Sequence, residues 1–240
     1  MTQTAPRSAL SNYKPDETRY NFYRNIHKAI RLGHCRLLAA LGSNDFTKND
    51  PTAKLLADLR GFLMLGKGHL EGENREIHAA LEQRMPGASS HAAEGHEEHE
   101  QAFAELEALM QAVETAKQGE KEKAGRALYY RYALFAAHDL EHMNEEETEL
   151  LCALQDAFTE EELHAIEGRI VSAIPAPKMA AAMSLMVPAL NHGERVELLS
   201  QLRQAMPQPA FDGLLSGVIK PSIPANDYTA VIGELMLRAA

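Results

Sequence analysis

Two histidine and glutamate pairs, each with a spacing of four residues, are the groups in this sequence best suited to metal chemistry. They are His69/Glu73 and His142/Glu146. On a helix, residues four apart share a face, so each pair directs an imidazole and a carboxylate at one point. Imidazole nitrogens bind iron, copper, zinc and nickel, and carboxylates supply hard oxygen ligands. The pairs therefore favour a centre of two metal ions, for which iron fits better than structural zinc.

Helical phase separates these pairs from others that arise by chance. A further pair of the same spacing, His78/Glu82, follows on the same helical segment as His69. At about 100° per residue, His69 and Glu73 lie on the apolar side of that segment, whereas His78 lies half a turn away. We expect His78 and Glu82 to form a solvated pair.

The same reasoning selects one histidine on the next segment. Its apolar arc is defined by Phe103, Leu106 and Met110. His99 lies at the centre of this arc, and His96 lies toward its edge. We therefore predict that His99 is a metal ligand and that His96 is structural.

Four helical segments are expected to position these residues, because apolar residues recur with a helical period between clear breaks such as Pro86-Gly87. The segments cover about residues 18–41, 51–85, 90–118 and 122–158. Short connections make neighbouring helices antiparallel. The sequence therefore predicts an all-α protein built on an up-down-up-down four-helix bundle.

The height of each histidine along its helix selects among the remaining candidates. At a rise of 1.5 Å per residue, His27 on the first segment lies level with His69 on the second. His34 lies about 10 Å further along, whereas the ions of a two-metal site are about 3.5–4 Å apart. We therefore predict His27 as a ligand and His34 as structural. His138, one turn before His142, is expected as a fifth histidine ligand, a group that orients a ligand imidazole, or a polar core residue.

Three parts of the chain are expected: an N-terminal arm over 1–17, the bundle over 18–158 and a helical extension over 159–240. The extension opens with a capping-box pattern from Thr159 to Glu162, and prolines then break it into short helices. Its histidines, His164 and His192, have no acidic residue four positions later. We expect packing there, or contact with a second copy or a protein partner, and no chemistry.

Composition narrows the class of protein further. The formal net charge of −10 is spread along the chain, which disfavours nucleic acid as a partner. The two cysteines have no CxxC spacing, so a reducing compartment fits best. The longest apolar run, over residues 179–190, is shorter than the about 20 residues that span a membrane, and no signal peptide is evident. We expect a cytoplasmic protein without a membrane partner.

The ordered set of motifs resembles the hemerythrin-like, or HHE cation-binding, family. The motifs are IHKAIR at His27, HLEGENREIHAAL from His69, EEHEQAFAEL at His99 and LEHMNEEETELL at His142. The resemblance covers about residues 18–158 and implies a four-helix bundle that holds a non-haem centre of two irons per chain. It implies terminal imidazole ligands and bridging carboxylates at His27, His69, His99, His142, Glu73 and Glu146.

The resemblance is to the bacterial branch of the family. Oxygen carriers of the family have a His-x-x-x-His pair on the third helix, but Gly95 and Phe103 flank His99 here at that spacing. The bacterial branch implies binding or sensing of dioxygen or nitric oxide. An enzyme or iron-handling stress protein, which reduces peroxide or nitric oxide or repairs iron centres, is one alternative. A helical interaction protein with a vestigial metal site is the other.

Overall fold

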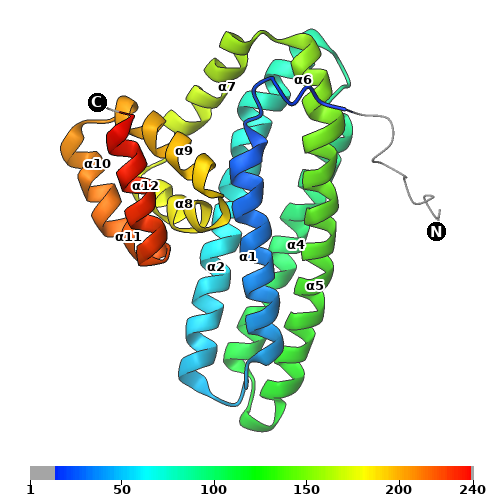
Figure 1. Ribbon diagram of the computed structural model, residues 1–240. Helices are drawn as coiled ribbons and strands as arrows, with labels where there is room; N and C mark the ends of the chain where they lie inside the picture. The colour runs from blue at the N-terminus through cyan, green and yellow to red at the C-terminus, as the bar shows by residue number, and fades with distance from the viewer. Residues whose placement is uncertain (1–13, 239–240) are drawn as a thin grey trace. The chain divides into compact units, whose positions relative to one another are not determined.

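The computed structural model describes residues 14–238, which are helical with no β-strand among them (Figure 1). The described chain forms two compact units, and each is considered by itself. The first unit comprises residues 14–24 and 37–173, and the second comprises residues 25–36 and 174–238. Helix α1 (Tyr23–Ser43) contributes its two ends to the first unit and its middle to the second.

Three long helical rods dominate the first unit. The first consists of α2 (Asn49–Gly72), the π-helical turn η1 (Glu73–His78) and α3 (Ala79–Arg84). The second is α4 (Ser90–Thr115). The third consists of α5 (Lys121–Glu145), the π-helical turn η3 (Glu146–Leu150) and α6 (Leu151–Ala157). Figure 1 shows α4 beside α5, and α2 also packs on α4. The three segments predicted for this region are confirmed as helical.

The ends of these helices follow from local chemistry. The side-chain oxygen of Asn21 accepts hydrogen bonds from the backbone N–H groups of Tyr23 and Arg24, at 3.0 and 3.1 Å. These bonds satisfy donors that a helix start leaves unpaired, and α1 begins here, five residues later than predicted. Between α3 and α4, Gly87 has a φ of 87°, a left-handed conformation that glycine adopts without strain.

Helix α7 (Glu160–Ser172) belongs to the first unit, so the structural boundary differs from the one predicted at residues 158/159. Leu163 and Ile166 of α7 are buried in a cluster with Ile77 and Leu81. Their burial attaches the helix to the rod that contains η1, and the unit ends only at residue 173. The predicted capping box at Thr159 is confirmed.

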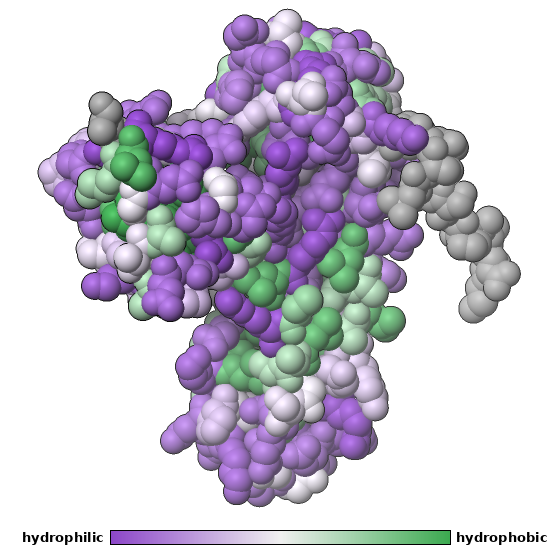
Figure 2. All heavy atoms as spheres, in the orientation of Figure 1, coloured by the Kyte–Doolittle hydropathy of each residue, from purple (hydrophilic) through white to green (hydrophobic). Residues whose placement is uncertain are grey.

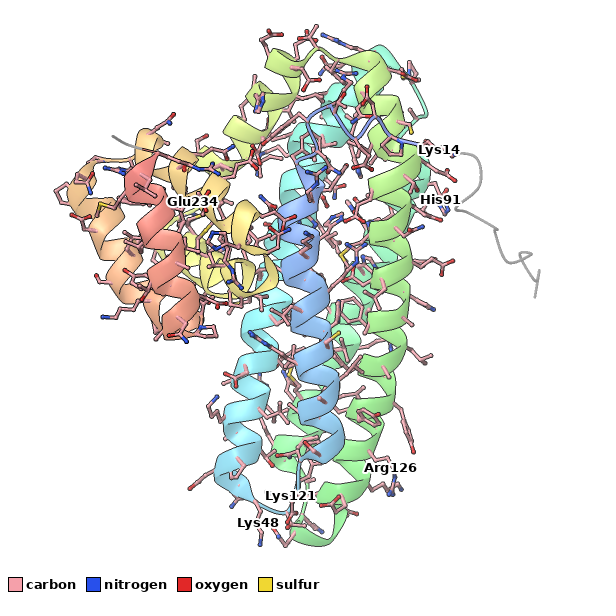
Figure 3. The ribbon with its side chains drawn as sticks, in the orientation of Figure 1. Lys14, Lys48, His91, Lys121, Arg126 and Glu234 are labelled. Atoms are coloured by element: carbon pink, nitrogen blue, oxygen red, sulfur yellow. The ribbon has the colours of Figure 1, made fainter. Side chains whose placement is uncertain are left out.

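The second unit contains short helices around a core of its own. They are α8 (Ala176–Ala189), α9 (His192–Ala205), α10 (Gln208–Leu214), η4 (Leu215–Ile219), α11 (Lys220–Ser222) and α12 (Ala225–Leu237). Val187, Leu199, Phe211 and Val231 lie in this core. Helix α9 packs on α12. On the outside of the unit, Glu234 accepts a hydrogen bond from His192 at 2.7 Å, in the surface position that Figure 3 labels.

The face of the molecule drawn in Figure 2 is largely hydrophilic (purple), with some hydrophobic residues (green) exposed on it. Charged side chains also connect helix ends: Lys121, labelled in Figure 3, donates from the start of α5 to the side-chain oxygen of Asn49 at the start of α2, at 2.6 Å. None of the described helices is long and apolar enough to cross a membrane by itself.

Candidate metal centre

The carboxylate of Glu73 lies between two imidazoles in the interior of the first unit. Its Oε1 atom is 3.2 Å from Nε2 of His69, and its Oε2 atom is 3.6 Å from Nε2 of His96. Glu73 and His96 are both buried. One carboxylate oxygen thus faces each imidazole, which is the disposition required of a carboxylate that bridges two metal ions.

Glu146 provides the second interior carboxylate and is 0% exposed. Its Oε1 atom is 3.4 Å from Nε2 of His142 and 3.5 Å from Nε2 of His96. Both carboxylates therefore approach the same imidazole of His96 from different helices. The predicted residues His69, Glu73, His142 and Glu146 are brought together.

These side chains form two donor groups of a size suited to metal ions. Ligand atoms of His69, Glu73 and Glu146 lie within 4.8 Å of one another, as do those of His78, His96 and Glu146. Metal–nitrogen and metal–oxygen bonds of about 2 Å place opposite ligands about 4 Å apart, so small rotations would close each group on an ion. The groups share Glu146, and their donors are buried except for His69, whose side chain is 13% exposed.

Both glutamates stand at the first residue of a π-helical turn, η1 at Glu73 and η3 at Glu146. In a π-turn the backbone hydrogen bonds span five residues, so residues five apart lie closer to one face than they do on an α-helix. Short π-turns inside α-helices are rare and occur often at functional sites. A third one, η4, contains no histidine or acidic residue. The informative feature is therefore the coincidence of a π-turn with a buried carboxylate.

The π-turn explains why the prediction for His78 was wrong. His78 is five residues after Glu73 and would lie half a turn from it on a regular α-helix. In the structure it is 5% exposed, and its ring stacks on His96 with centroids 4.9 Å apart. The carboxylate of Glu82 instead accepts from the backbone N–H groups of Gly87 and Ser89, at 2.6 and 2.9 Å. A constant 100° per residue did not allow for the extra residue in the turn.

On α4, His96 rather than His99 faces the carboxylates. His99 is buried, but its Nε2 lies 3.7 Å from Oδ1 of Asp139. Burial lowers the pKa of His99 to about 4, and the carboxylate of Asp139 offsets only part of this effect. The inner face of α4 includes the buried residues Ala92 and Ala102, whereas Phe103 is only half-buried. The centre of this face was therefore predicted wrongly, because the prediction relied on the large apolar side chains.

A hydrogen bond orients the imidazole of His96. Its Nδ1 is 2.7 Å from the side-chain oxygen of Asn74, the residue that follows Glu73. With that oxygen as acceptor, Nδ1 carries the proton and Nε2 presents its lone pair toward the carboxylates, as a metal ligand must. Asn74 was not among the predicted residues, because no spacing rule connects an asparagine on one helix to a histidine on another.

Gly95 makes room for the imidazole of His142. A Cβ atom at position 95 would lie 2.7 Å from Nδ1 of His142. Burial by itself lowers the pKa of His142, but the carboxylate of Glu146 outweighs it and raises the pKa to about 9. The protonated imidazole of His142 places a positive charge beside the buried carboxylate of Glu146. A bound metal cation would replace that charge.

Three further histidines were considered from the sequence: His138, His27 and His34. His138 is exposed on α5, which contradicts its predicted place among the ligands, and the next residue, Asp139, faces His99 instead. His27 and His34 are both fully buried on the part of α1 that belongs to the second unit. His27 stays a predicted ligand on the grounds of its height along the helix.

Tyr23, in the first turn of α1, is a further buried polar residue of the first unit. Burial, together with the negative charges of Glu146 and Glu73, raises the pKa of its phenol well above the ordinary value. The phenol is therefore neutral at physiological pH and keeps its proton near the two carboxylates.

Comparisons with protein-family models, with curated proteins and with solved structures found no match for the chain. Function is therefore inferred from the site alone.

Among the described residues, neither ring nitrogen of His78 has a hydrogen-bond partner, and burial of such groups is costly. A metal ion would offset that cost and neutralise the two carboxylates. The histidine and glutamate cluster thus fits a bound metal.

Proposed function

We propose that the protein is a non-haem di-iron protein with a hemerythrin-like four-helix bundle, which binds or senses dioxygen or nitric oxide. The observation that carries this proposal is the pair of buried carboxylates, Glu73 and Glu146, each of which faces two imidazoles. Mixed imidazole and carboxylate donors suit iron, and carboxylates that face two donor groups suit a pair of ions.

The chain supplies a distinct role for each group around the proposed pair. Glu73 and Glu146 are the bridging ligands, and His69, His96 and His142 are terminal ligands. His27 is proposed as a further ligand from the sequence. Ferrous iron, when bound with an open coordination position, supplies reversible binding of dioxygen or nitric oxide.

Burial of the donors favours a small ligand over a larger substrate. Of the donors in the first unit, only His69 reaches solvent appreciably. Exclusion of water lowers the local dielectric and limits the loss of bound iron or of a reactive ligand to solvent. A diatomic molecule fits such a site without any large opening of the helices. Binding or sensing is therefore preferred to turnover of an organic substrate.

The test begins with iron per chain, measured by elemental analysis after anaerobic purification. Two irons per chain are expected, and the visible absorption of the ferrous protein should change on exposure to air or to nitric oxide. The double variant Glu73→Gln with Glu146→Gln should lose both the iron and the response. Glu97→Gln with Glu98→Gln is the matched control, because it removes two exposed carboxylates and leaves the interior unchanged.

Three results would contradict the proposal. Iron binding that survives in the interior double variant would show that the ligands lie elsewhere. Failure to take up two irons even after ferrous reconstitution, or uptake of zinc without a spectral response, would leave the interaction protein as the better interpretation. Sustained consumption of peroxide or nitric oxide by the reduced protein would instead identify an enzyme.

A further inference from the structure

His78 is a buried imidazole that the proposed di-iron ligand set does not use. Its ring is covered on one side by His96, at an interplanar angle of 16°. Among the described residues, neither Nδ1 nor Nε2 of His78 has a hydrogen-bond partner. A leucine would fill this space without the cost of two buried polar atoms. A histidine at this position therefore requires something that its nitrogens can bind.

The surroundings of His78 indicate what that partner is. One of its nitrogens lies within 4.8 Å of ligand atoms of His96 and Glu146, which makes it the third member of the second donor group. Two imidazoles and a carboxylate are a set that binds iron, cobalt or zinc.

The backbone of η1 contributes to the same placement. Glu73 is the first residue of this π-turn and His78 is the last, so the turn brings both toward one side of the rod. A regular helix through the same residues would turn His78 away from the carboxylates. The π-turn thus brings His78, a donor of the second group, to the same side as Glu73, which faces both donor groups.

We infer that His78 is a direct ligand of the second metal ion of the centre, beside His96 and Glu146. This inference rests on the proposed function, because it assigns a residue to the same pair of ions. It adds a histidine that the family resemblance does not imply. The second ion would then have the imidazole of His78 as a ligand in addition to the carboxylates and the imidazoles of His96 and His142.

The competing interpretation is that His78 is only a packing partner of His96. The two interpretations differ in the effect of His78→Leu. As a packing residue, His78 can be replaced with little change in metal affinity. As a ligand, its loss should weaken one of two metal-binding steps at least 10-fold and leave the other within 2-fold. Under the ligand interpretation, the metal-free variant should melt no lower than the parent, because the leucine removes two unsatisfied nitrogens.

The experiment is an anaerobic titration of the full chain with Co²⁺, followed by visible absorption. The parent protein should bind two Co²⁺ ions, and in His78→Leu one of the two binding steps should be weakened at least 10-fold. His138→Leu is the matched control, since His138 is exposed and the same substitution there should leave both steps unchanged. A second variant, His78→Cys, should give a thiolate-to-cobalt charge-transfer band that is absent from the parent, which carries the same free Cys35 and Cys152.

The outcomes separate this inference from the proposed function. Two cobalt sites in the parent, with the same affinities in His78→Leu and no thiolate band in His78→Cys, would overturn the role of His78 and leave the di-metal centre intact. A parent protein that does not bind two ions would overturn both. If His78→Leu does not fold, the band in His78→Cys decides the question.

Discussion

Gly95→Ala offers the sharpest test of the geometry at His142. The added Cβ would lie 2.7 Å from Nδ1 and 3.1 Å from Cε1 of that imidazole, whereas ordinary contact begins near 3.4 Å. The ring would have to move by about 0.7 Å, and it is buried between α4 and α5. Because Nδ1 belongs to a rigid ring, the displacement carries Nε2 away from Glu146.

Two opposing effects set the stability of Gly95→Ala. Replacing glycine inside a helix stabilises by about 1 kcal/mol, and overpacking a buried contact costs about 1–3 kcal/mol. The metal-free variant should therefore range from neutral to about 2 kcal/mol less stable. Gly61→Ala in α2 is the control, because an added Cβ there meets nothing within 4 Å. The control should gain the full helix contribution of about 1 kcal/mol.

The difference between these two glycine variants isolates the contact with His142. Chemical denaturation of the metal-free proteins measures that difference, for which we expect about 1–3 kcal/mol. Iron affinity should fall in Gly95→Ala alone, by about 10–100-fold, since groups that orient ligands affect affinity on that scale. If Gly95→Ala were stabilised as much as Gly61→Ala and kept two tightly bound irons, the position assigned to His142 would be incorrect.

Three further predictions concern single contacts. Asn74→Ala should weaken metal binding about 10–100-fold in competition with a chromophoric chelator, and Asn74→Asp, which keeps an acceptor for His96, should restore most of it. Thr159→Ala should cost about 1 kcal/mol by chemical denaturation, because it removes the cap of α7. The pKa of Glu162 is lowered to about 2, mainly by its hydrogen bond with Arg84, so its contribution to stability is present above pH 4.5 and lost as the pH falls toward 2. Glu162→Gln should therefore lower the melting temperature at pH 7 but not below pH 2, and an equal effect at both pH values would contradict the ion pair.

Much of the helical framework was accessible from the sequence because its breaks are chemically explicit. Pro86-Gly87 and the region of Gln118 interrupt strong helix formers, and the described helices end within a few residues of those breaks. The two pairs with four-residue spacing were also found, since that spacing works on any α-helix. The boundary after residue 158 was misplaced for a tertiary reason. Attachment of α7 depends on the burial of Leu163 and Ile166 against a distant part of the chain.

The second donor group was missed for a different reason. Helical phase was extrapolated with one fixed angle per residue, which is valid only while every turn is α-helical. η1 adds a residue to its turn and so rotates His78 inward. On α4, small alanines such as Ala92 define the buried face as much as large side chains do, and periodicity gives them little weight. Both errors arise where backbone geometry or side-chain size departs from the average that a pattern assumes.

The two π-turns at Glu73 and Glu146 are a backbone feature of the candidate metal centre that metal binding could stabilise. A π-turn is rarely populated in helices, so it persists where surrounding structure or a ligand compensates for it. Here one begins at each interior carboxylate, on rods that both pack in the first unit. If metal binding provides that compensation, removal of the metal should loosen these turns before the rest of their helices. Amide hydrogen exchange tests this directly: η1 and η3 should lose protection in the metal-free protein while α4 keeps it, and equal protection in both states would mean that packing alone maintains the turns.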